Sequence, residues 1–164
     1  MLGSEARIEA LSKHEGGHHV HILMLEQANL RAALQHSVEH QESKSAAGLL
    51  LAYSALVNLK GPHQILTSFC ERILKGHSLS TPLRVRVLLE YARALRISVG
   101  TEQAHESAQQ AYDLTQKTGN THHEALALGL LAIIDQQAGH TQAALENTQR
   151  SLALHRANGN RIYE

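Results

Sequence analysis

The stretch from Thr121 to Asn160 constrains the fold of this chain more than any other. Its apolar residues recur at the spacing of amphipathic helices, and Gly139 separates two such runs. Because glycine commonly ends a helix, we predict one helix from about Thr121 to Ala138 and a second from Thr141 to Gly159. Neither helix could bury its apolar face alone, so such a hairpin needs neighbours. The expected faces are Leu126, Leu128, Leu131, Ile133 and Ile134 in the first helix, and Ala144, Leu145, Leu152 and Leu154 in the second.

Capping residues predict where these helices begin. Thr121 followed by Glu124 matches a capping box, in which the two side chains bond each other's backbone amides. Thr141 is the expected N-cap of the second helix, and Thr101 that of the equivalent helix upstream. The helix starts are therefore predicted at threonines.

The same hairpin recurs upstream. The closing Gly-Asn pairs begin at Gly119 and Gly159, 159 − 119 = 40 positions apart. The turn glycines Gly61, Gly100 and Gly139 recur at 100 − 61 = 39 and 139 − 100 = 39 positions. A near-constant period of this length is typical of helical solenoids. We therefore predict an all-α protein, a right-handed alpha-alpha superhelix with a lead-in helix at 21–41 and antiparallel hairpins at about 45–76, 81–119 and 121–159.

The composition of the chain indicates which kinds of partner and which cellular compartment to expect. The 15 basic and 15 acidic residues balance at pH 7, which argues against nucleic acid or an anionic membrane as the main partner. Aromatic residues are only 3% of the chain and no stretch alternates at period two, so we expect no strands. No long apolar run or signal-peptide pattern is present. The single cysteine, Cys70, lies on an apolar helix face as a small buried hydrophobe, which fits a cytoplasmic protein.

The segment 1–20 is expected to hold a short helix and a loop rich in His and Gly, ahead of a repeat domain at 21–164. The loop contains His14-Glu15-Gly16-Gly17-His18, which matches H-E-x-x-H, where two histidines bind zinc and the glutamate activates water. Two adjacent glycines would destabilise the helix that this motif requires by about 2 kcal/mol. With 13 histidines in the chain, a chance match is also easy. The alternatives are a zinc hydrolase with His14 and His18 as zinc ligands, adventitious metal binding by the cluster His14, His18, His19 and His21, and a solvated loop. No cofactor is expected.

A basic stripe is the second candidate site. On a helix, Arg86, Arg93 and, less closely, Arg96 lie toward one side, with Tyr91 nearby in the sequence. Such a stripe could bind a carboxylate or phosphate of a partner. The alternative is that these arginines are solvated or paired with neighbours such as Glu90.

Several core positions resemble those of tetratricopeptide (TPR) repeats, namely Leu128, Leu131-Ala132, Ala144 and Ser151-Leu152. The large aromatic positions of that consensus are missing, and its usual period of about 34 residues is shorter. Longer repeats of this kind resemble the arrays of STAND-type bacterial regulators, MalT-like and AfsR-like. The run Asn29-Leu30-Arg31-Ala32-Ala33-Leu34 looks like the helix that opens such an array, and the segment 152–160 resembles the ends of its repeats.

The resemblance implies a non-catalytic module for protein–protein interaction or regulation, which binds a protein or peptide in a concave groove. The chain contains no G-x-x-x-x-G-K-[ST] loop and no evident basic recognition helix, so the ATPase and DNA-binding activities of the parent regulators are not assigned to it. A sensor that binds a small effector is an alternative. Because no polar capping helix follows the last hairpin, self-association through that end is a further expectation, which would give a homo-oligomer.

Overall fold

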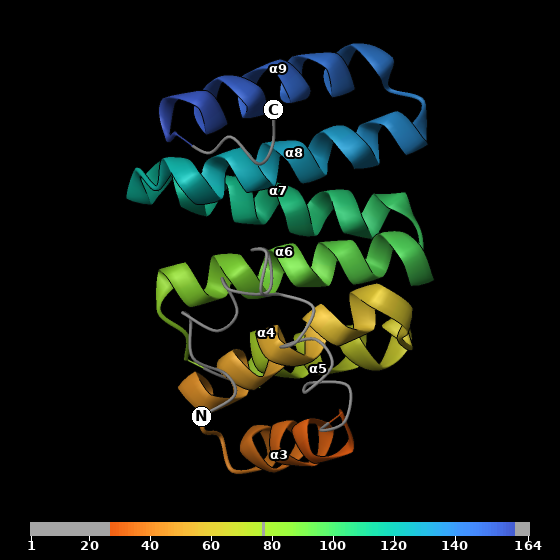
Figure 1. Ribbon diagram of the computed structural model, residues 1–164, viewed down its shortest axis with the longest axis vertical. Helices are drawn as coiled ribbons and strands as arrows, with labels where there is room; N and C mark the ends of the chain where they lie inside the picture. The colour runs from red at the N-terminus through yellow and green to blue at the C-terminus, as the bar shows by residue number, and fades with distance from the viewer. Residues whose placement is uncertain (1–26, 77, 160–164) are drawn as a thin grey trace. The chain divides into compact units, whose positions relative to one another are not determined.

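Figure 1 shows the computed structural model, which describes residues 27–76 and 78–159. All the regular structure in these residues is α-helical, so the all-α prediction is confirmed for this part of the chain. No helix in the described ranges combines the length and hydropathy needed to cross a bilayer. The helices are α3 (Gln27–Glu39), α4 (Ser43–Lys60), α5 (His63–Gly76), α6 (Thr81–Ser98), α7 (Thr101–Thr118), α8 (Thr121–Ala138) and α9 (Thr141–Ala157).

The chain divides into two compact units, Met1–Leu83 and Arg84–Glu164, here called the N-terminal and C-terminal units. The division falls within the first turns of α6, so nearly all of that helix belongs to the C-terminal unit. In the N-terminal unit, α3 and α5 both pack against α4. Helix α4 is apolar on most sides, as its central position requires.

The core of the N-terminal unit is built on α4. Leu30 of α3 packs with Ala52 and Leu56 of α4. On the α5 side, the rings of Tyr53 and Phe69 meet edge to face, with centroids 6.4 Å apart. Cys70 is fully buried, which confirms its predicted place in the core.

In the C-terminal unit, α7 packs against α8 and α8 against α9, and consecutive helices run antiparallel (Figure 1). Small residues let α8 and α9 approach closely. A Cβ added to Gly129 would lie 3.3 Å from the Ser151 hydroxyl oxygen, and that hydroxyl donates a 2.8 Å hydrogen bond to the Ala125 carbonyl.

The helices of this unit keep a step of 40 residues. Helices α6 and α8 begin 121 − 81 = 40 positions apart, and α7 and α9 begin 141 − 101 = 40 positions apart. The turn glycines Gly100 and Gly139 are one residue closer than this step because they occupy different positions in two-residue turns. Glycine is the second residue of the turn Val99-Gly100 and the first residue of the turn Gly139-His140. Gly139 has φ +83°, the left-handed conformation that ends a helix.

The helices α7, α8 and α9 begin at the predicted threonines, but the predicted N-caps are wrong by one residue. The N-cap of α8 is Asn120, whose Oδ1 accepts a 3.0 Å hydrogen bond from the His123 amide. Thr121 lies inside the helix, and its hydroxyl donates to Asn158 Oδ1 at 2.9 Å. Asparagine is among the strongest N-capping residues, so it prevails over the threonine that follows it. The N-caps of α7 and α9 are likewise not the threonines but the residues before them, Gly100 and His140.

The predicted apolar faces are only partly buried. Leu128, Leu131 and Ile134 are in the core, whereas the side chains of Ile133 and Leu145 are 47% and 52% exposed. Apolar residues of α8 and α9 occupy more of the circumference than the packed stripe covers. The uncovered residues therefore mark a face of the hairpin that no described helix contacts.

Candidate functional site

The basic stripe predicted from the sequence lies on α6. The Arg93 guanidinium pairs with Glu90, a buried carboxylate three residues earlier on the same helix. Arg93 is therefore bonded within its own helix. Neither of the grooves described below is lined by Arg86, Tyr91, Arg93 or Arg96. His14 and His18 lie outside the described residues.

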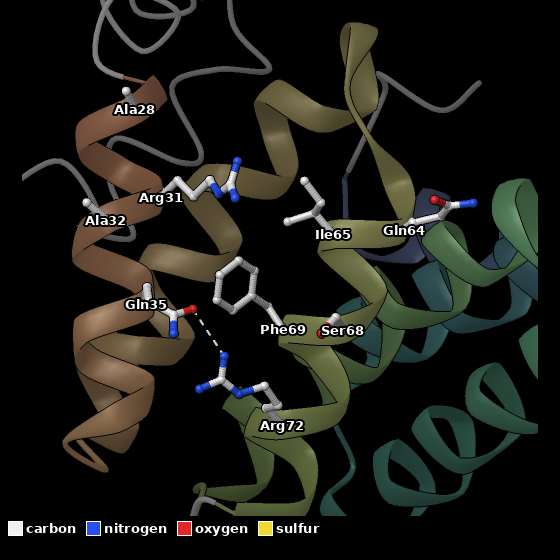
Figure 2. A pocket seen from close by; sticks show the side chains of 9 residues that line it. All are labelled: Ala28, Arg31, Ala32, Gln35, Gln64, Ile65, Ser68, Phe69 and Arg72. Carbon is white, nitrogen blue, oxygen red and sulfur yellow. Dashed lines mark hydrogen bonds between the residues drawn. The ribbon is translucent and has the colours of Figure 1, made fainter.

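A groove of about 640 Å³ runs between α3 and α5 in the N-terminal unit (Figure 2). It forms because both helices rest on α4 while contacting each other only slightly. We call it the α3–α5 groove. Its lining comprises Ala28, Arg31, Ala32 and Gln35 of α3, and Gln64, Ile65, Ser68, Phe69 and Arg72 of α5.

The apolar part of the α3–α5 groove is held in place by the core. Phe69 is buried, and its ring packs edge to face on Tyr53, itself 1% exposed. Ile65, one turn earlier on α5, is half-buried beside it. A ligand would therefore meet a preformed apolar surface rather than side chains that must first be ordered.

Two arginines supply the charge of the groove. Arg72 Nη1 donates to Gln35 Oε1 at 3.1 Å, and its Cζ lies 5.9 Å from the centroid of the Phe69 ring, within cation–π range. Arg31 projects toward the same space from α3 (Figure 2). Among the described residues, neither guanidinium has an ion pair with a carboxylate. Gln35 also donates to Glu39, one turn along α3, so its amide is fixed from both sides.

The lining residues form stripes at helical spacing. On α3 they recur at positions 28, 31, 32 and 35, and on α5 at 64, 65, 68, 69 and 72. Each stripe is visible in the sequence, but an exposed stripe with one arginine is common. The informative fact is that the two stripes face each other, which only the packing on α4 decides.

A second polar cluster lies in the C-terminal unit around Asp135, a buried carboxylate of α8. Its Oδ2 accepts a 3.0 Å hydrogen bond from Asn147 Nδ2 of α9. Its Oδ1 lies 3.5 Å from His105 Nε2 of α7 and 3.7 Å from His140 Nδ1 of the α8–α9 turn. Within the described residues, no group of three or more His, Cys, Asp or Glu side chains is arranged to hold a metal ion. The cluster serves to join three elements of this unit.

His155 is the third buried polar residue of note. It lies on α9 and is 4% exposed. Burial lowers the pKa of its imidazole from 6.5, and the nearby His122 lowers it further, because both disfavour the charged form. Nothing in the sequence pattern distinguishes this histidine from the others.

We compared the chain with known proteins, and no family model, curated protein or solved structure matches it.

Proposed function

We propose that this chain is a non-catalytic protein-interaction module, a TPR-like solenoid that binds an acidic peptide segment of a partner protein in the α3–α5 groove. The observation that carries the proposal is the pair Arg31 and Arg72, which approach one groove from two helices over the buried Phe69 ring. Arginine pairs with carboxylates in a planar, two-point geometry. An apolar side chain next to the carboxylate would rest on Phe69 and Ile65.

The hairpin repeat supports this class of protein. The 40-residue step from α6 and α7 to α8 and α9 lies within the range of repeat lengths in solenoids of stacked helix pairs. Arg31 belongs to the run Asn29–Leu34, whose resemblance to the opening helix of MalT-like arrays supports placing the module in a bacterial signalling or transcriptional regulator. Its role there would be to bind the partner, not to perform chemistry.

The test is a peptide selection followed by affinity measurement. Peptides selected from a random library on the whole chain should be enriched in Asp or Glu beside an apolar residue. Arg31→Gln and Arg72→Gln should each weaken binding of the best selected peptide about tenfold, the usual effect of removing one charge-assisted pair. Fluorescence anisotropy with the labelled peptide measures the change.

Lys75→Gln is the matched control. It removes the same charge from α5, but Lys75 is highly exposed, pairs with Glu71 and does not line the groove. Binding should be unchanged in this variant. Selected peptides without acidic residues, or equal affinity for the wild type and both arginine variants, would refute the proposed function.

A further inference from the structure

The outer face of the last hairpin carries a second groove, of about 600 Å³, between α8 and α9. We call it the α8–α9 groove. Its floor is made of small residues, Gly129, Ala132 and Ala144, and its rims carry Ile133 and Leu145. These two side chains are 47% and 52% exposed. The lining also includes the polar residues Gln136, Thr141, Thr148, Ser151 and His155, so the groove has an apolar strip along its floor and rims and is open to solvent.

The preceding hairpin, α6–α7, has an equivalent face, and there the next hairpin covers it. Residues 40 positions apart are equivalent in the two hairpins. The row His105, Ala108 and Tyr112 on α7, here called the α7 ridge, therefore corresponds to Leu145, Thr148 and Leu152 on α9. The α7 ridge is covered by the next hairpin. Ala108 is fully buried, His105 Nε2 lies 3.5 Å from Asp135 of α8, and the Tyr112 hydroxyl accepts a 2.5 Å hydrogen bond from Arg150 of α9.

No described helix covers the equivalent ridge on α9, where Leu145 and Thr148 are exposed and Leu152 is half-buried. If the α8–α9 groove were normally exposed to solvent, we would expect the residues at its rims to be more polar than the equivalent residues of the covered α6–α7 hairpin. The opposite is found. Arg93 and His105 in the covered hairpin correspond to Ile133 and Leu145 in the uncovered one. Aliphatic residues thus stand at the rims in place of an arginine and a histidine, which points to an apolar occupant.

We propose that the α8–α9 groove binds an amphipathic α-helix of a partner protein, seated on α9 as α8 is seated on α7. The small residues of the floor let a helix approach closely, and the groove continues the interface by which α7 receives α8. One residue of the occupant can be specified. Where α8 places Asp135 beside His105, the partner helix places an aliphatic residue beside Leu145, because the Leu145 side chain offers a carboxylate no hydrogen bond.

The probe is a pair of labelled peptides, one with the sequence of α8 (Thr121–Ala138) and one with Asp135→Leu in that sequence. The Asp135→Leu peptide should bind the whole chain about tenfold more tightly than the unchanged peptide, since it buries no charge against Leu145. Leu145→Glu and, separately, Thr148→Arg in the protein should abolish binding. Fluorescence anisotropy measures affinity, and circular dichroism verifies that each variant is folded.

Ile97→Glu is the matched control, because Ile97 of α6 is an aliphatic residue of the same unit with 51% exposure, and it does not line the groove. This variant and Arg72→Gln should both bind like the wild type, which separates the result from that for the α3–α5 groove. Three results would each overturn the proposal: no binding of either peptide, no effect of Leu145→Glu, or a molar mass of two chains that Leu145→Glu returns to one. The last would make a second copy the occupant.

Discussion

The hydroxyl of Ser151 on α9 donates a 2.8 Å hydrogen bond to the carbonyl oxygen of Ala125 on α8. The same hydroxyl oxygen lies 3.3 Å from the position that a Cβ on Gly129 would occupy. One side chain thus both joins the two helices and limits what can stand at Gly129. Two substitutions test this coupling.

Ser151→Ala should destabilise the chain by about 1 kcal/mol, the usual net value of one hydrogen bond. Gly129→Ala should be close to neutral in the wild type, because a helix-propensity gain of about 1 kcal/mol is offset by crowding against Ser151. In the Ser151→Ala background the crowding is gone and the full gain should appear. Urea unfolding of the four proteins measures the coupling, and an equal effect of Gly129→Ala in both backgrounds would contradict it.

Asp135→Ala should destabilise the chain by about 2 kcal/mol, because it leaves the Asn147 amide without its acceptor and opens a small cavity. Asp113→Ala is the control. Asp113 is exposed on α7 and, among the described residues, accepts a hydrogen bond from Gln109, so its loss should stay within about 0.5 kcal/mol. Chemical denaturation measures both, and similar values for the two variants would show that the buried cluster contributes little.

His155 should make the chain less stable in mild acid. Its pKa is lowered in the folded state, first by burial and then by His122, so the unfolded chain binds the proton more readily. The stability contributed by the neutral imidazole is complete above about pH 6.5 and is lost as the pH falls toward the folded-state pKa. Unfolding free energies at about pH 8 and pH 5 should differ more in the wild type than in His155→Gln. Equal differences would refute this role of His155.

Gly139→Ala should destabilise the chain by about 1 kcal/mol, because φ at this position is +83° and no neighbouring atom would obstruct the new methyl group. The cost is therefore one of backbone conformation alone. Gly76→Ala is matched to it, since Gly76 also has no atom within 4 Å of an added Cβ but has no positive φ. Thermal unfolding should show no loss for Gly76→Ala, and an equal loss in both would exclude the backbone explanation.

Cys70 should resist thiol reagents in the native state, because it is fully buried on α5. Its labelling rate in increasing urea should follow the opening of the N-terminal unit. Ser68→Cys in a Cys70→Ala background provides the control, since Ser68 is exposed two residues away and should react at once. Rapid labelling of native Cys70 would show that this part of the core opens readily.

The sequence by itself determined where the helices lie. Apolar spacing predicted α8 with the bounds Thr121–Ala138 that it has, Gly139 marked its end, and Cys70 was correctly assigned to the core. These features are local: helical periodicity and left-handed glycine turns depend on neighbours within one or two turns. The N-cap of α8 was misassigned by one residue because Asn120 and Thr121 are both good N-caps, and only the bond to the His123 amide distinguishes them.

The tertiary structure alone decided which faces meet. Arg31 and Arg72 are 72 − 31 = 41 positions apart, and they share a groove only because α3 and α5 both rest on α4. Likewise, helical spacing assigned Leu145 to the apolar face of its helix, but it could not predict that this residue would be 52% exposed. Periodicity shows that a helix has an apolar stripe. Whether that stripe is covered depends on side chains brought close from distant parts of the chain, and their contacts leave no short-range trace in the sequence.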